Sequence, residues 1–182
     1  RANSLLYTTI YYVRQTLRPY HNHIRVKNAS DGYVLETKDV VLDVEKWKKE
    51  LALLPAINET TIERYTEVMQ QYKGPYLQEY NYLWAEADQY RLEQQWLTVA
   101  LEIANFYLQN NITQAKFWYS RICEFVPETE EAHFALMKIY AYENNHSQVH
   151  KQFETLTEVL KEELGMMPNS EVINWFKTWK KK

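Results

Sequence analysis

The side chains best suited to chemistry lie near the N-terminus, where cations, hydroxyls and amides occur without carboxylates. Residues 1–30 contain five Arg or Lys and no Asp or Glu, whereas the whole chain has 21 basic and 24 acidic residues. A basic end on an acidic chain favours a polyanionic partner. Arginine can contact guanine or phosphate with two N–H groups, and hydroxyls can donate to phosphate oxygens. The candidate nucleic-acid-binding residues are Thr8, Tyr11, Tyr12, Arg14, Gln15, Arg18, Arg25 and Lys27.

Other reactive residue types give weaker signals. His146 and His150 are spaced for one helical face, but nothing nearby supplies a convincing third metal ligand. Cys123 falls on an apolar helical stripe, which is typical of a buried, inert thiol. The 3 glycines are too far apart for a phosphate-binding loop. We therefore expect no enzyme, no catalytic residue, no metal and no cofactor.

The basic residues must be positioned by a helix and a hairpin. The helix should begin near Asn3 or Ser4 and end at Arg18, because Pro19 stops it. Alternating residues predict strands at 24–27 and 33–35, joined by a turn over residues 28–32. The expected inner stripe of the helix is Leu6, Ile10, Val13 and Leu17. A helix followed by a basic hairpin is the order of winged helix-turn-helix DNA binders, although an ordinary amphipathic helix with an aromatic outer face fits the same pattern.

An internal repeat organises the rest of the chain, because residues 97–164 match themselves after a shift of 34 positions. Asn110-Asn111 falls on Asn144-Asn145, and each copy predicts two amphipathic helices around a polar turn. This is the tetratricopeptide period, in which helix pairs stack because one pair cannot bury its own apolar face. A generic helical bundle is the alternative. The expected inner stripes are Leu97, Leu101, Ala104 and Leu108; Ala115, Trp118, Ile122 and Phe125; Ala132, Leu136, Ile139 and Tyr140; and Val149, Phe153, Leu156 and Leu160.

Further helices are predicted on both sides of the repeat. Residues 43–54 should form a short helix that ends before Pro55, and a second should begin near Thr60. One long helix or two abutting helices should cover residues 84–110. A final helix after Pro168 should cover the open end of the stack.

These residues resemble a known family of regulators. The run from Thr8 to Leu17 resembles the recognition helix of the OmpR-type winged helix, and the run from Ile24 to Leu35 resembles its wing. Residues 43–47 resemble the segment that follows the wing in the Streptomyces antibiotic regulatory protein family. The remainder is similar to the bacterial transcriptional activator domain of that family. The matching motifs are Tyr72-Lys73-Gly74-Pro75-Tyr76-Leu77, Trp84, Arg91-Leu92, Pro127-Glu128-Thr129-Glu130-Glu131-Ala132-His133, Leu136-Met137 and Leu160 to Pro168.

The resemblance implies a mainly α-helical protein with two domains. Residues 1–42 would form the C-terminal half of a winged helix, and residues 43–182 would form the tetratricopeptide-like repeats of the activator domain. Two departures from the family stand out. The small sheet and two helices that precede the recognition helix are absent from this sequence, so the inner stripe would be left loose or covered by a neighbouring copy. Tyr11 and Tyr12 also stand where the family often has Arg or Lys.

The function implied by the resemblance is that of a DNA-binding transcriptional regulator, as the output part of a two-component phosphorelay. Its partners would be double-stranded DNA and, for the helical repeats, RNA polymerase or a second copy in a dimer. The alternative is a tetratricopeptide-like scaffold that binds proteins without binding DNA directly. A single cysteine fits the cytoplasm. No membrane partner is expected, because no apolar run approaches the roughly 20 residues needed to cross a bilayer.

Overall fold

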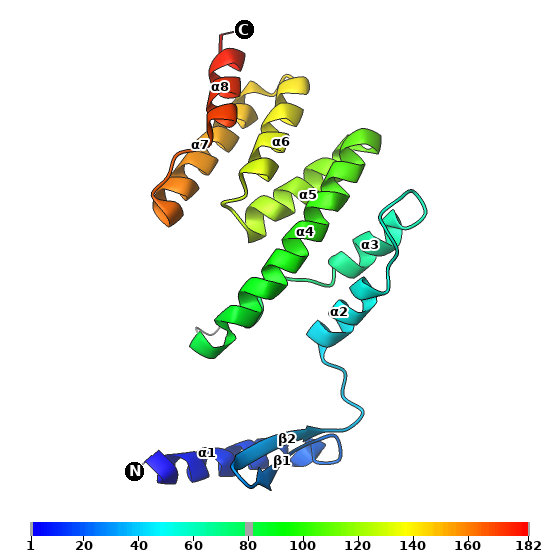
Figure 1. Ribbon diagram of the computed structural model, residues 1–182, viewed down its shortest axis with the longest axis vertical. Helices are drawn as coiled ribbons and strands as arrows, with labels where there is room; N and C mark the ends of the chain where they lie inside the picture. The colour runs from blue at the N-terminus through cyan, green and yellow to red at the C-terminus, as the bar shows by residue number, and fades with distance from the viewer. Residues whose placement is uncertain (1, 79–81, 182) are drawn as a thin grey trace. The chain divides into compact units, whose positions relative to one another are not determined.

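The computed structural model describes residues 2–78 and 82–181, and these residues are mainly helical. They form a helix and a β-hairpin followed by a helical domain, which confirms the predicted fold class (Figure 1). The chain divides into two compact units, here called the N-terminal unit (Arg1–Lys49) and the helical unit (Glu50–Lys182). The domain boundary predicted between residues 42 and 43 stays a prediction. Within the described residues, no helix combines the length and apolarity that crossing a membrane would require.

The N-terminal unit contains the helix and hairpin expected from the sequence. Helix α1 (Ala2–Leu17) is followed by the 3₁₀ turn η1 (Arg18–Tyr20), where the ring of Pro19 fits the first helical positions. Strands β1 (Ile24–Ala29) and β2 (Gly32–Thr37) pair antiparallel, with Val26 opposite Leu35. Each strand is longer than predicted. Gly32 has a φ of 146°, a value that glycine adopts readily at the tight turn between the strands. Helix α2 (Asp43–Ala52) begins in this unit and ends in the next.

The helical unit is a succession of antiparallel helices in chain order. It contains α3 (Ile62–Met69), the 3₁₀ turn η2 (Leu83–Ala85), α4 (Glu86–Asn110), α5 (Ile112–Phe125), α6 (Glu130–Tyr142), α7 (His146–Leu164) and α8 (Ser170–Trp179). From α3 to α7, each helix lies against the next one in the sequence (Figure 1). The segment predicted over residues 84–110 is therefore one long helix preceded by a 3₁₀ turn.

The repeat of 34 positions is visible in the helix starts. Asn111 and Asn145 are both N-caps, and their side chains accept hydrogen bonds from the backbone N–H of Gln114 and Gln148. An Asn at this position satisfies one of the N–H groups that the first helical turn leaves unpaired. The apolar positions also match, because Ile122 and Leu156, which corresponds to it in the second copy, are both fully buried. The tetratricopeptide-like spacing thus has a structural basis in caps and core positions.

The predicted inner stripe of α4 is wrong only at its last member, because Ala104 is completely buried and the two leucines before it are half-buried. Leu108 is 40% exposed, whereas Trp96, Ala100 and Ile103 are completely buried. The large indole of Trp96 and the small side chain of Ala100 occupy the line that faces the core. The leucine pattern suggested a neighbouring line because a helix that packs on both sides has more than one apolar stripe. The other three stripes lie inward, with every member buried or half-buried.

Aromatic side chains form the junction between α3, α4 and α5. The ring of Tyr72 stacks on that of Trp96 at a centroid distance of 5.4 Å, and Trp96 lies 5.0 Å from Phe125. The guanidinium of Arg121 packs over Phe125 and donates to the carbonyl oxygen of Tyr72 at 2.9 Å. Burial raises the pKa of the Tyr72 hydroxyl to about 12, with the nearby charge of Glu93 contributing. This junction explains the aromatic residue with which the motif at residues 72–77 begins.

Helix α8 covers one side of the α6–α7 pair, as expected for the last helix. Val172 joins Met137, Val149, Leu156 and Leu160 in one buried cluster. Around it lie the half-buried rings of Phe134, Tyr140, Phe153, Trp175, Phe176 and Trp179. Gly165 separates α7 from this last segment with a φ of 65°, in the left-handed region where glycine is favoured.

Candidate nucleic-acid interface

The outer face of α1 carries the predicted hydroxyl and aromatic residues. Tyr11 and Tyr12 are 57% and 64% exposed, and their rings meet edge to face at 5.6 Å. The Thr8 hydroxyl donates to the carbonyl oxygen of Ser4 at 2.9 Å. This bond uses the only proton of that hydroxyl, which can then act toward a ligand only as an acceptor. Exposed hydroxyl donors on α1 therefore include those of Tyr11 and Tyr12 together with that of Tyr7, which is 63% exposed.

Arg14 joins α1 to the hairpin. Its Nε donates to the carbonyl oxygen of Val26 at 3.1 Å, and its Nη2 donates to Oδ1 of Asn28 at 2.7 Å. The guanidinium also lies 5.6 Å from the centre of the Tyr33 ring. Arginine presents five N–H groups in a fixed fork, so these bonds hold the helix and hairpin in register while other donors remain. The predicted DNA contact at Arg14 stays a prediction, but its side chain has a structural role that the sequence did not indicate.

The two faces of the hairpin have different chemistry. Cross-strand partners share a face, so Val26 and Leu35 lie on one side and Arg25 and Glu36 on the other. Arg14 bonds to residues that belong to the first side. The face opposite to it carries Arg25 and Lys27, which are two positions apart on β1. The prediction that these two cations share a side is confirmed by the register.

Glu36 binds both cations of the hairpin. Its carboxylate accepts from Lys27 Nζ at 2.6 Å and from Arg25 Nε. The hydrogen bond from Lys27, followed by the one from Arg25, lowers the pKa of the Glu36 carboxyl. All three groups are open to solvent, where such ion pairs add little to stability. Their consequence is for binding, because an incoming phosphate would compete with Glu36 for the same two cations.

This carboxylate was missed because it lies outside the acid-free run of residues 1–30. A turn over residues 30–31 would have placed Arg25 opposite Glu36 by counting outward from Ala29 and Gly32. The sequence therefore contained the necessary signal, but only for an argument that fixes strand register.

The remaining predicted residues of this region are exposed. Gln15 and Arg18 lie on the surface, the second in η1. The inner stripe is only partly covered within the N-terminal unit, since Ile10 and Leu17 are half-buried. Leu6 and Val13 are 48% and 37% exposed. The roles of all eight predicted DNA-binding residues stay predictions.

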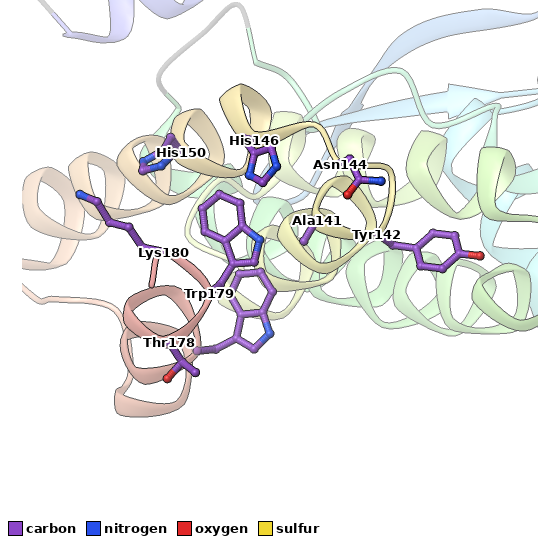
Figure 2. A pocket seen from close by; sticks show the side chains of 9 residues that line it. Ala141, Tyr142, Asn144, His146, His150, Thr178, Trp179 and Lys180 are labelled. Carbon is purple, nitrogen blue, oxygen red and sulfur yellow. The ribbon is translucent and has the colours of Figure 1, made fainter. Parts of the chain in front are cut away.

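The histidine pair of α7 lies in an aromatic pocket. The ring of His146 stacks on Trp179 at 5.3 Å, and His150 meets Phe176 edge to face at 5.2 Å. Figure 2 shows both imidazoles on α7, close to Trp179 of α8, with Lys180 at the side of the pocket. In the part of the chain that the structure describes, no group of three or more His, Cys, Asp or Glu is arranged to bind a metal.

His133 and Cys123 are connected through Gln152. His133 Nε2 lies 2.9 Å from the carbonyl oxygen of Pro127, and its Nδ1 lies 2.6 Å from Nε2 of Gln152. Because a carbonyl only accepts and the amide nitrogen only donates, the imidazole is satisfied in its neutral form with the proton on Nε2. Burial lowers the pKa of His133 and raises that of the Cys123 thiol to about 12. These groups therefore fit a structural role within the helical stack.

Comparison with known protein families identifies the helical part of the chain. Residues 48–177 match the family model of the bacterial transcriptional activator domain. Neither the comparison with curated proteins nor that with solved structures gives a match. The matched segment begins in α2 and ends in α8, so it includes α3 to α7 in full.

Proposed function

Since the chain belongs to the bacterial transcriptional activator domain family, we propose that it acts in a transcriptional regulator that binds double-stranded DNA through α1 and the hairpin. The family is non-catalytic and is characteristic of Streptomyces antibiotic regulatory protein regulators. Membership places the chain in transcription regulation. The DNA contact and its residues are the proposal.

The observation that carries the proposal is the coupling of a helix that exposes hydroxyl and amide groups to a hairpin with cations on its outer face. Arg14 holds the two elements together by its bonds to Val26 and Asn28. Helix α1 would enter the major groove, where Tyr12, Gln15 and, just after the helix, Arg18 of η1 meet base edges or phosphates. Arg25 and Lys27 on the hairpin would contact the backbone or the minor groove. In protein–DNA complexes, contacts to phosphates fix the position of the protein on the duplex, and contacts in the groove distinguish the base sequence.

The test is the salt dependence of binding by the full-length protein. Fluorescence anisotropy with DNA from upstream of its own gene, between about 50 and 250 mM salt, gives the affinity and the slope of its logarithm. Lys27→Gln and Arg18→Gln should each weaken binding and reduce the slope by about 1. Arg14→Ala is less informative, because it would also free the hairpin from α1. The matched control is Lys151→Gln, an exposed lysine on α7.

Two results would contradict the proposal. One is full-length protein that shows no preference for its upstream DNA at low salt. The other is wild-type binding whose affinity and slope are unchanged in both variants. Absence of DNA binding together with capture of a peptide by the helical unit would favour the protein-binding scaffold, since stacked helix pairs present surfaces of that kind.

The helical unit would serve self-association or contact with RNA polymerase. The regulator would be the cytoplasmic output part of a two-component phosphorelay. Both extensions rest on the family resemblance. Sedimentation of the full-length protein, with and without acetyl phosphate, tests self-association and the phosphorelay together. A phosphate-dependent dimer would support both, and an unchanged monomer would argue against both and leave contact with RNA polymerase as the role of the helical unit.

A further inference from the structure

A hollow lies at the open end of the hairpin, and it contains residues that the sequence did not single out for binding. It is lined by His21, His23, Arg25, Glu36 and Lys38, among others. The backbone N–H of Lys38 donates to the carbonyl oxygen of His23 at 2.7 Å, which joins the two chain segments just beyond the ladder. We call this hollow the hairpin pocket. Its position beside the outer hairpin cations makes it part of the same surface.

Both histidines of the hairpin pocket are held in one orientation. His21 Nδ1 lies 3.1 Å from the carbonyl oxygen of Arg18, and His23 Nδ1 lies 3.3 Å from that of Lys38. A carbonyl oxygen only accepts, so Nδ1 is the donor in each ring and Nε2 is the nitrogen left for a ligand. Protonation of the imidazole turns Nε2 into a second donor. With the proton on Nδ1, Nε2 of a neutral ring is an acceptor, so only the imidazolium form offers a second N–H to an anion.

The charges around the two rings favour an anion over a metal. Arg25 and Lys38 line the hairpin pocket and would repel a cation, while Glu36 is already bound to Arg25 and Lys27. Two cations and one carboxylate leave one net positive charge on the lining when the histidines are neutral. Protonation of His21 and His23 would add to it.

We propose that the hairpin pocket binds a phosphate group, and that Glu36 is the internal anion with which this phosphate competes. The proposal rests on the proposed function, in which the phosphate belongs to the backbone of the duplex next to the hairpin. His21, His23 and Lys38 then join Arg25 as phosphate contacts. Glu36 keeps Arg25 and Lys27 extended on the outer face and reduces their attraction for DNA, so its removal strengthens binding.

Substitutions with opposite expected effects test the arrangement. In the full-length protein, Lys38→Gln should weaken binding to the upstream DNA several-fold and reduce the salt slope by about 1. Glu36→Gln keeps the shape of the side chain and should strengthen binding several-fold with a steeper slope. Lys151→Gln on α7 is again the control. Loss of a merely structural contact would not strengthen binding, so a Glu36→Gln variant that binds no better than wild type would overturn the role of Glu36.

A double variant tests the histidines. His21→Gln/His23→Gln removes both rings from the hairpin pocket and should weaken binding to the upstream DNA several-fold. The charged groups that face the two rings are Arg25, Glu36 and Lys38 of the lining and Arg18 of η1. They are unchanged in the double variant. Wild-type affinity in the double variant would overturn the part assigned to the histidines.

Inorganic phosphate separates this inference from the proposed function. Titration of the wild type with phosphate against chloride at equal ionic strength should shift the backbone amide NMR signals of His23 and Lys38, and Lys38→Gln should suppress the shift. If the protein binds no DNA but shows this shift, the hairpin pocket stands and the DNA proposal fails. If it binds DNA while the pocket variants match wild type and phosphate causes no shift, only the hairpin pocket fails.

Discussion

Protonation of His133 should make the helical unit less stable in mild acid. In the folded state this imidazole is neutral, with its Nε2–H donating to the carbonyl oxygen of Pro127 and its Nδ1 accepting from the side-chain amide of Gln152. Burial lowers its pKa below the ordinary value of 6.5, which the unfolded chain retains. The unfolded state therefore takes up a proton first as the pH falls. The contribution of neutral His133 to the free energy of unfolding is complete above pH 6.5 and is lost progressively below that pH.

The size of the effect has an upper limit. If the folded state binds no proton at His133, the free energy of unfolding falls by about 1.4 kcal/mol between neutral pH and one pH unit below the ordinary value. Glu93 acts in the opposite sense. Burial, reinforced by the charge of Glu128, raises the pKa of Glu93, so this group favours the folded state as the pH falls. A comparison between variants that differ only at His133 removes the contribution of Glu93.

The variant His133→Gln provides that comparison. Glutamine can donate to Pro127 and accept from Gln152 but does not titrate, so its stability should depend less on pH over the same range. Urea unfolding followed by circular dichroism at about pH 7.5, 6.5 and 5.5 gives the free energies. His150→Gln is the control, because it removes an imidazole from the surface pocket of α7 instead. Parallel pH profiles for wild type and His133→Gln would refute the reasoning.

Two further predictions concern the caps and the thiol of the helical unit. Asn111→Ala and Asn145→Ala should each lower stability by about 1 kcal/mol and Tm by about 4 °C in thermal unfolding. The control Asn110→Ala, one position before the first cap, should have little effect. Equal losses of stability in all three variants would argue against the caps. Cys123 should react with iodoacetamide at least about 100-fold more slowly in the folded protein than in urea at about pH 8, because burial raises the pKa of its thiol to about 12, and equal rates in a mass-spectrometric time course would contradict this.

Local signals in the sequence were sufficient for most helices and for several of their ends, although they left residues 84–110 as either one helix or two. Asn111 and Asn145 could be placed at helix starts because capping depends on a side chain and a backbone group three residues away. The stop at Gly165 has the same local origin, since only the backbone conformation of one residue is involved. The repeat added the information that the two helix pairs are equivalent.

Interactions between elements were harder to predict from the sequence than the elements themselves. The buried line of α4 runs through Trp96 and Ala100, but a helix that packs against several neighbours has competing apolar stripes, and sequence spacing does not rank them. The ion pairs of Glu36 depend on strand register, and the bonds of Arg14 depend on how α1 packs on β1. The sequence of residues 24–37 therefore suggested that Arg25 and Lys27 are available for a ligand. In the structure both side chains already form ion pairs with Glu36.

The order in which the helices pack has a consequence for how this chain can change length. The close helix neighbours from α3 to α7 are consecutive in the sequence, so each helix is supported mainly by the one before it and the one after it. Insertion or deletion of one complete pair would alter the reach of the stack while preserving the remaining interfaces. Such a change would be far more disruptive in a fold whose central element touches every other one.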